Sequence, residues 1–383
     1  MKVAIVAGET SGDYLGSELI EAMRAHFPDT EFVGLCGPLM QEQGAVTLAE
    51  MGKISIFGLD GLLGSIREIL SIRKKLYEHF IEWQPDIFIG IDVPDFNLAL
   101  EAKLKQKNIP VIHYVSPTVW AWRGGRIKKI RRSIDLMLTL FPFEKTYYQQ
   151  HDTPVEYVGH PLAKQVLDWQ VPQEFAEKFI DHLADKKLIA LMPGSRASEV
   201  TKLAPVMLDA AVQLKQKFPN LIFVIPAANQ KLLDKIVAMP EYQDAEVDII
   251  LGHSRDLLAV CNMAILASGT AALEAALFAK PMIVLYKVSK LSAWVYKNSI
   301  TVEHYSMPNH LTNPPIVPEL IQDNATVNNL VLEAQKLLID EERFTSMQTA
   351  LAQIAPDLNK NSGQLICSAI TELLNKKKAS KVQ

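Results

Sequence analysis

The sequence contains little of what marks several large classes of protein. Its three cysteines, Cys36, Cys261 and Cys367, are far apart and form no Cys-x-x-Cys pair, so we expect neither a zinc site nor a disulfide framework. No apolar run approaches the length of a membrane-spanning helix, and Val3–Ala7 is too short for the core of a signal peptide. The net charge is only −4, so no general positive field attracts nucleic acid. We therefore predict a soluble or peripheral protein of the reducing cytoplasm.

What the chain has instead is a repeated alternation of strand and helix patterns. Its 383 residues, 49% hydrophobic and 21% charged, are enough for two or three globular domains. Strands that are apolar on both faces and alternate with helices predict parallel sheets covered on both sides, so we expect two doubly wound α/β domains. The predicted strands are 3–7, 32–36, 87–91, 111–115, 136–140 and 155–158, then 188–192, 222–225, 247–251, 264–267 and 282–286.

The seam between the two domains is predicted between His160 and Asp185, where the strand pattern lapses and prolines appear. We predict domains at 1–165 and 166–340, followed by helices at 341–383 that pack back on the first domain or on a partner chain. In open α/β sheets, ligands bind at the carboxyl ends of the strands, where the strand order reverses. The residues that directly follow strands are therefore the candidates for function.

Two such segments in the second half predict a nucleotide-diphosphate site. The segment PGSR, with Gly194, Ser195 and Arg196, turns into a helix whose first N–H groups favour an anion, and the arginine suits phosphate oxygens. Its spacing excludes a P-loop. The segment SGT, which comprises Ser268, Gly269 and Thr270, opens another helix and forms a second cradle for phosphate, and Glu274 lies one turn further on, placed for sugar hydroxyls. The alternative is a routine helix cap followed by an exposed glutamate.

The first predicted strand leads into the segment AGETSGD. Its glycines are spaced by four, so the dinucleotide fingerprint is absent. Glu9, Ser11, Gly12 and Asp13 form a loop that suits a hydroxyl-rich ligand better than a pyrophosphate. The alternative is that Ser11 or Asp13 caps the helix that follows.

Two aspartates follow the strand at 87–91 in the segment GIDVPDFN. Asp95 lies just ahead of the next helix, and we predict that it is the N-cap. Asp92 comes directly after the strand, where a partly desolvated carboxylate can act as a general base toward a hydroxyl. Metal binding by the pair is the alternative, but no histidine or third acid stands nearby in the sequence. We therefore expect no metal and no cofactor.

The segment IFGLDGLLGSIREIL gathers apolar side chains ahead of several basic ones. Leu59, Leu62, Leu63 and Ile66 make a glycine-broken apolar start that suits acyl chains or a bilayer surface. The alternative is an ordinary amphipathic helix that packs on the sheet.

Aromatic and basic residues lie together in the segment WAWRGGRIKKIRRS. Trp120 and Trp122 precede a run of cations that begins with Arg123 and Arg126, which suits an anionic lipid surface or a phosphate-bearing substrate. A solvated helix face is one alternative. Binding of RNA is another, although the acidic net charge and the lack of a nucleic-acid motif make it less favourable.

Seven strings of residues together resemble the lipid-A-disaccharide synthases. They occur in the order VAGETSGD, GIDVPDFN, HYVSPTVWAWR, FPFEK, GHPL, LMPGSR and ASGTAALEAAL, across nearly the whole chain. The resemblance implies a GT-B glycosyltransferase, with two Rossmann-like domains facing across a cleft. It implies transfer from UDP-2,3-diacylglucosamine to 2,3-diacylglucosamine 1-phosphate, with β-1,6 linkage, inversion, no metal and release of UDP. It also implies peripheral binding to the cytoplasmic face of the inner membrane of Gram-negative bacteria.

The resemblance also implies roles for individual residues. Asp92 matches the catalytic base, and Asn309 in the segment MPNHL matches a loop asparagine that faces the donor. The segment around Leu62 matches a region that meets membrane or acyl chains, and family members exchange C-terminal segments in a homodimer. The other matching positions are Arg196, Ser268, Gly269, Thr270 and Glu274 on the donor side, and Glu9, Ser11 and Asp13 on the acceptor side. Rival functions are a UDP-sugar 2-epimerase, a non-catalytic nucleotide-sugar sensor and an RNA-binding protein.

Overall fold

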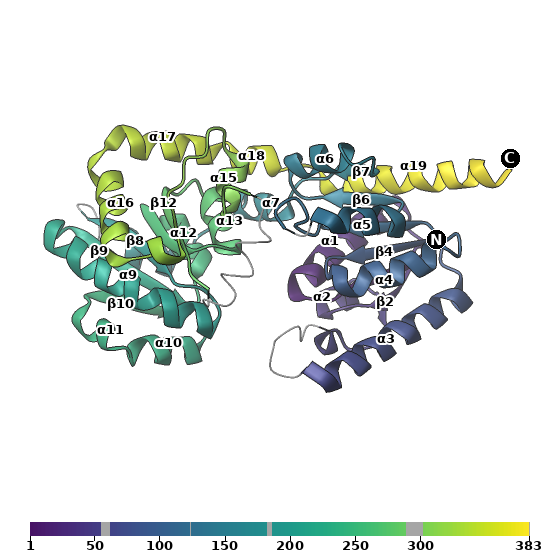
Figure 1. Ribbon diagram of the computed structural model, residues 1–383, viewed down its shortest axis with the longest axis horizontal. Helices are drawn as coiled ribbons and strands as arrows, with labels where there is room; N and C mark the ends of the chain where they lie inside the picture. Colours follow the sequence, from purple (N-terminus) through teal and green to yellow (C-terminus); the bar gives the residue numbers. More distant parts are fainter. Residues whose placement is uncertain (55–61, 123, 182–185, 289–301, 383) are drawn as a thin grey trace. The chain divides into compact units, whose positions relative to one another are not determined.

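The computed structural model of the chain describes residues 1–54, 62–122, 124–181, 186–288 and 302–382 (Figure 1). The chain divides into two compact units. The first comprises Met1–Pro161 with Lys360–Gln383, and the second comprises Leu162–Asn359. This division differs from the predicted one in the C-terminal region, because the helices before residue 360 belong to the second unit and only the last helix joins the first.

The first unit is built on a seven-stranded parallel sheet with the order β3-β2-β1-β4-β5-β6-β7. Successive strands are added outward from β1 on one side and outward from β4 on the other, so the strand order reverses between β1 and β4. All six predicted strands of this half are confirmed. The strands are β1 Lys2–Ala7, β2 Glu31–Leu35, β3 Val46–Thr47, β4 Ile87–Ile91, β5 Val111–Tyr114, β6 Leu136–Thr139 and β7 Val155–Tyr157.

Helices cover both faces of this sheet. Helices α3, α4 and α5 pack side by side on one face, while α1 packs with α2 and α19. The last helix is fixed on α1 in part by Cys367, whose thiol donates to the carbonyl of Ala22 at 3.6 Å. The helices are α1 Thr10–His26, α2 Pro38–Glu42, α3 Leu62–Trp83, α4 Pro94–Lys105, α5 Ile127–Ser133, α6 Pro142–Gln149 and α19 Ser362–Val382.

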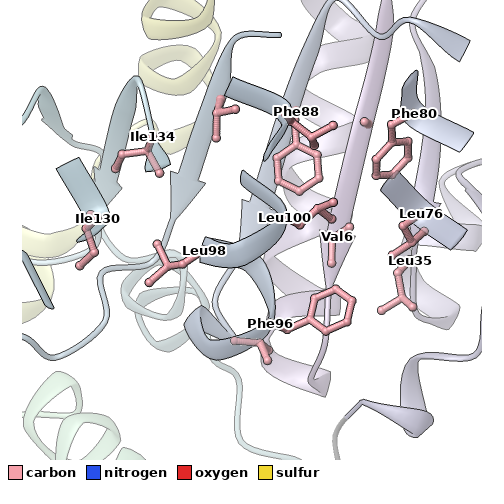
Figure 2. Packing of buried hydrophobic residues seen from close by; sticks show 14 of the residues in the cluster. Val6, Leu35, Leu76, Phe80, Phe88, Phe96, Leu98, Leu100, Ile130 and Ile134 are labelled. Atoms are coloured by element: carbon pink, nitrogen blue, oxygen red, sulfur yellow. The ribbon is translucent and has the colours of Figure 1, made fainter. Parts of the chain in front are cut away.

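The core of the first unit lies between its sheet and the helices α3 and α4. Every residue of β4 is buried, as the apolar run predicts for a strand covered on both faces. Leu76 and Phe80 of α3 and Phe96 of α4 join Val6 and Phe88 of the sheet in one apolar cluster (Figure 2). The rings of Phe80 and Phe88 are 5.8 Å apart. This packing fixes the carboxyl end of β4, from which Asp92 projects.

The second unit repeats the architecture with six parallel strands in the order β10-β9-β8-β11-β12-β13. Its strand order reverses between β8 and β11. The five predicted strands of this half are confirmed. The strands are β8 Lys187–Met192, β9 Leu221–Ala227, β10 Val247–Leu251, β11 Met263–Ala267, β12 Met282–Tyr286 and β13 Glu319–Ile321.

The helices of the second unit also pack in two groups. Helix α9 packs with α10, α11 and α16, whereas α13 packs with α12, α15, α17 and α18. In the part of the chain that the structure describes, no helix has both the length and the apolarity that crossing a bilayer requires. The helices are α7 Pro161–Leu167, α8 Gln173–Ala176, α9 Ala197–Lys217, α10 Gln230–Val237, α11 Pro240–Asp244, α12 Ser254–Val260, α13 Thr270–Leu277, α15 Met307–Leu311, α16 Val327–Ile339, α17 Glu341–Ala352 and α18 Ile354–Leu358.

Candidate active site

Asp92 occupies a tight turn at the switch point of the first sheet. It directly follows β4, and both Asp92 and Val93 have left-handed backbones, with φ values of 51° and 42°. Such a conformation is costly for a β-branched residue and persists only where surrounding contacts impose it. The Asp92 N–H donates to the carbonyl of Tyr114 at 2.8 Å, and the Asn97 side-chain amide donates to the Asp92 carbonyl at 2.8 Å. The Asp92 backbone is thereby fixed at the end of the strand.

The chain after β1 adjoins this turn. Its loop is shorter than the sequence predicts, because α1 begins at Thr10 with Glu9 as its N-cap, and Ser11, Gly12 and Asp13 lie in the first turn of that helix. Ala7 pairs with Ile91 in the sheet, and a Cβ placed on Gly8 would lie only 2.6 Å from Cγ2 of Val93. Glu9 and Ser11 are exposed there, whereas Gly12 is buried.

Asp13, the last of the acceptor-side residues predicted in this loop, is buried. Its two carboxylate oxygens accept the N–H groups of Leu39 at 3.0 Å and Met40 at 3.1 Å. These donors belong to the first turn of α2, so Asp13 satisfies the start of a neighbouring helix. Its contact with the acceptor stays a prediction, and this structure gives it a supporting role that joins the first turn of α1 to the start of α2.

Asp95 is not the N-cap that the sequence predicts. Helix α4 begins at Pro94 and its N-cap is Val93, so Asp95 lies within the first turn. Its negative charge there is favoured by the helix dipole. The carboxylate of Asp95 forms an ion pair with the guanidinium of Arg126.

A pocket of about 280 Å³ opens beside Asp92 within the first unit. Asp92 and Arg126 are its charged lining residues, and the loop after β5 supplies hydroxyl groups. The Trp122 indole N–H donates to Oγ1 of Thr118 at 2.9 Å. The structure therefore brings two of the predicted lipid-contact residues, Trp122 and Arg126, to the candidate base. The pocket is lined by Asp92, Pro94, Val115, Ser116, Pro117, Thr118, Val119, Trp122 and Arg126.

Trp120 has a different environment from Trp122. Its indole N–H donates to Oε1 of Glu144 at 3.2 Å, and its ring packs edge-on against Phe143 at 4.8 Å. Glu144 is 3% exposed and also accepts the N–H of Phe141 at 3.2 Å. Burial raises the pKa of Glu144 to about 7, although these hydrogen bonds act to lower it. The sequence analysis predicted no role for Glu144. Its only signal was its place in FPFEK, one of the strings that carry the family resemblance.

A buried pair of ionisable residues lies beneath the Asp92 turn. Nδ1 of His113 on β5 is 2.6 Å from Oε1 of Glu101 on α4, and both side chains are wholly buried. Burial acts to lower the pKa of His113, but the charges of Glu101 and Asp92 raise it above its usual value. Burial raises the pKa of Glu101. Gly90 makes room for the pair, because a Cβ there would lie 2.3 Å from Oε1 of Glu101.

The PGSR segment follows β8 at the switch point of the second sheet. The N-cap of α9 is Arg196. Oε2 of Glu199 accepts the N–H groups of Ser195 at 3.2 Å and Arg196 at 3.3 Å. Glu199 therefore binds the N–H groups that directly precede the helix, and binding of a ligand anion at this helix start stays a prediction. The Arg196 side chain is 79% exposed and contacts Oε1 of Glu199 at 3.0 Å.

The SGT segment follows β11, the strand next to β8, so it lies at the same edge as PGSR. Gly269 is the N-cap of α13 with φ 150°, a conformation that favours glycine, and a Cβ there would meet nothing within 4 Å. Ser268 Oγ donates to the carbonyl of Tyr305 at 3.0 Å, and Thr270 is exposed. The helix start is therefore accessible to an anionic ligand.

Glu274 is held in place by a neighbouring helix. Its Oε1 accepts Nε–H of Arg255 at 2.8 Å, and only 13% of its side chain is exposed. Arg255 also donates to Oε1 of Gln165 at 3.1 Å and lies over the ring of Trp169. The alternative of an exposed helix glutamate is therefore wrong. Arg255 was missed by sequence reasoning, since the contact joins positions 19 residues apart.

Asn309 is buried in α15, ahead of the loop that leads to β13. Its amide nitrogen donates to the carbonyl of Val317 at 2.9 Å and to Oε1 of Glu319 at 2.8 Å. Its amide oxygen accepts the N–H groups of Ile316 at 3.0 Å and Val317 at 2.9 Å. The amide therefore shapes the loop, and contact with the donor stays a prediction.

The predicted lipid-contact segment is described only in part. Leu59 and Arg123 lie outside the described residues, as do the side chains of Leu62 and Leu63. Ile66 is exposed by 48%, and Leu70, one turn further along α3, is exposed by 49%. These two side chains form an apolar stripe on the solvent side of α3.

Comparisons with known proteins match the chain over nearly its full length. Residues 3–371 match the family model described as lipid-A-disaccharide synthetase. A lipid-A-disaccharide synthase from Pseudomonas putida is 43% identical, covering 92% of this chain and 95% of that protein. One from Aeromonas hydrophila is 39% identical, covering 98% of this chain and 99% of that protein.

Solved structures with little sequence identity share the fold. A UDP complex of Staphylococcus aureus MnaA has a TM-score of 0.65 at 15% identity, covering 98% of this chain and 96% of that one. UDP-GlcNAc 2-epimerase from Neisseria meningitidis, bound to UDP-GlcNAc, has a TM-score of 0.64 at 14% identity, and the match covers 97% of this chain and 100% of that one. Acinetobacter baumannii MurG has a TM-score of 0.58 at 13% identity, and the match covers 97% of this chain and 99% of that one. The fold is thus that of GT-B glycosyltransferases and related epimerases.

Proposed function

The chain belongs to the lipid-A-disaccharide synthase family, and we propose that the loops at its two switch points carry out the transfer of that family. The reaction joins UDP-2,3-diacylglucosamine to 2,3-diacylglucosamine 1-phosphate through a β-1,6 linkage and releases UDP. The observation that carries the proposal is the position of Asp92, directly after β4 and in a pocket with hydroxyl-bearing walls. The first unit then binds the acceptor and the second binds the donor.

In the proposed mechanism Asp92 is the general base. The 6-hydroxyl oxygen of the acceptor attacks the anomeric carbon of the donor from the face opposite to UDP. The new carbon–oxygen bond forms as the bond to UDP breaks, and the electron pair of that bond leaves with the diphosphate. The hydroxyl proton passes to the Asp92 carboxylate, which later returns it to solvent. Attack from the opposite face inverts the anomeric centre.

The second unit is proposed to hold UDP and to stabilise the charge that it gains. The accessible N-terminus of α13, with Gly269 and Thr270, suits the diphosphate, and the exposed Arg196 adds a positive charge. Glu274 suits the sugar hydroxyls. The UDP and UDP-GlcNAc complexes of the structural neighbours support a UDP-sugar ligand for this fold. With these groups in place the proposed transfer uses no metal ion.

The substrates carry acyl chains, so we propose that the enzyme acts at the cytoplasmic face of the inner membrane. The exposed side chains of Ile66 and Leu70 on α3 support a peripheral contact with lipid. A homodimer that exchanges α19 would keep the contact of Cys367 with Ala22, now between two chains.

The function is tested by measuring UDP release from UDP-2,3-diacylglucosamine with and without the acylated acceptor. Release of UDP together with a disaccharide, and only when the acceptor is present, is the expected result. Interconversion of UDP-GlcNAc with its 2-epimer in the absence of an acceptor would instead indicate an epimerase.

A further inference from the structure

We propose that the 280 Å³ pocket beside Asp92 binds the sugar 1-phosphate headgroup of the acceptor, with Arg126 as the residue that holds its phosphate. This inference rests on the proposed function, in which the first unit binds the acceptor. The phosphate is then the part of the acceptor that is recognised, and Arg126 is the side chain that recognises it. It also gives Arg126 a role different from the lipid-surface contact that the sequence predicts.

The charges of the pocket match the two ends of such a headgroup. A carboxylate, Asp92, and a guanidinium, Arg126, line the same pocket. A sugar phosphate that offers a hydroxyl to the carboxylate offers a phosphate to the guanidinium. Arginine binds phosphate with paired hydrogen bonds of fixed geometry, so it orients the sugar as well as attracting it.

The walls between these two residues suit a monosaccharide. Thr118 contributes a hydroxyl group that accepts the Trp122 indole N–H, and the Trp122 ring offers an apolar face. The Ser116 hydroxyl is bound to Tyr148 at 3.0 Å behind this wall. The volume of 280 Å³ is close to the lower end of the range of about 300 to 1,000 Å³ for small-molecule sites. The pocket therefore has room for one sugar ring and its phosphate, while the acyl chains must lie outside it.

The partner of Arg126 in this structure is one that a phosphate can replace. Arg126 pairs with Asp95, whose side chain is 53% exposed. An ion pair whose carboxylate is half exposed to solvent contributes little, whereas a phosphate carries more charge and can bind through two oxygens. Asp95 then competes with the substrate for Arg126 and can turn toward solvent when the phosphate binds.

The experiment compares two acceptors, 2,3-diacylglucosamine with and without its 1-phosphate, at saturating donor in detergent micelles. Arg126→Ala should lower kcat/KM for the phosphorylated acceptor by about 10- to 100-fold, mostly through KM, because a charged hydrogen-bond partner is lost. It should change kcat/KM for the acceptor without phosphate by less than about threefold. Asp95→Asn should lower KM for the phosphorylated acceptor alone, because it removes the competing carboxylate.

Two further variants keep the test decisive. Arg126→Lys retains the charge without the paired geometry, so a partial loss is expected, and it replaces the alanine variant if that one does not fold. Arg131→Ala removes an arginine of α5 that pairs with Asp152 outside the pocket, and it should leave the kinetics with both acceptors unchanged. An equal loss on both acceptors, or no loss with Arg126→Ala, would overturn the proposal.

Two further measurements distinguish this proposal from a membrane role for Arg126 and from failure of the proposed function. Binding of the Arg126 variants to vesicles that contain anionic lipid should equal that of the wild type, and a loss there would assign Arg126 to the membrane surface instead. Failure of the proposed function itself would appear as full turnover of the Asp92→Asn variant with either acceptor. The ratio of kcat/KM for the two acceptors, which measures selectivity for the phosphate, does not depend on the result with Asp92→Asn.

Discussion

Arg255 of α12 donates to Glu274 of α13 at 2.8 Å, and the same guanidinium lies over the ring of Trp169. The largely buried Glu274 is thus held by an arginine that is itself held by contact with Trp169. Glu274 is the residue proposed to bind sugar hydroxyls of the donor. Arg255 is therefore a positioning residue for the donor site, even though it was not evident from the sequence.

Arg255→Ala should weaken donor binding rather than the chemical step. We expect KM for UDP-2,3-diacylglucosamine to rise about tenfold with kcat changed by less than about threefold, because one well-oriented hydrogen bond is lost. Arg255→Lys should restore part of the effect. Steady-state kinetics with varied donor measures it. The control is Arg343→Ala, which breaks the 3.0 Å pair with Glu333 elsewhere in the same unit. An equal fall in kcat for both alanine variants would reduce Arg255 to a stabilising role.

The buried Glu144 should make stability depend on pH. Its pKa in the folded protein is raised to about 7, from an ordinary value near 4.5, so the folded state holds a proton that the unfolded state releases between these values. This contribution to the free energy of unfolding is complete below about pH 4.5 and is lost as pH rises through about 7. Its size is at most about 3 kcal/mol.

Glu144→Gln removes the titrating group, so its stability relative to the wild type should improve as pH rises from 5 to 8. Urea unfolding followed by tryptophan fluorescence measures this, since Trp120 donates to Glu144. Glu156→Gln, at an exposed pair with Lys145, is the control and should follow the wild-type profile. Parallel profiles for wild type and Glu144→Gln would contradict the assignment.

Removal of metal ions should leave the transfer intact. The departing diphosphate is proposed to be stabilised by the start of α13 and by Arg196, and these groups remain when metals are removed. We expect turnover in excess EDTA to stay within about twofold of the untreated rate, measured by UDP release. Activity that is lost in EDTA and restored by Mg²⁺ would show that the stabilising charge comes from a cation. Arg196→Ala should lower activity by about tenfold or more in both conditions.

Much of the fold was predictable because a parallel strand that is buried on both faces appears in the sequence as a short run of apolar residues. The runs that became β4 and β11 are buried at every position, so the sequence shows them as unbroken apolar segments. The same pattern located the loops at both switch points. The edge strands β3 and β13 span only two and three residues and were missed, because so short a segment becomes a strand by pairing with its neighbour.

The sequence could predict which segments form the candidate site, but it could not predict most of the side-chain contacts within it. The prediction for Asp95 failed because Pro94 begins α4 and moves the N-cap to Val93. The sequence does carry a signal for Glu199, a glutamate three residues after the N-cap, which is the usual place for a side chain that satisfies a helix start. The contact of Glu101 with His113 carries no such signal, since it joins a helix to a neighbouring strand that only the fold brings together.

The most direct test of the central claim is the turnover of Asp92→Asn, measured together with its affinity for UDP. Asn keeps the shape of the side chain but cannot accept the proton, so transfer should fall by about 100-fold or more while the Kd for UDP is unchanged. Asp86→Asn makes the same change at the opposite end of β4, where Asp86 accepts the N–H of Lys2 at 2.7 Å, and should retain full turnover. Wild-type turnover by Asp92→Asn would contradict the account.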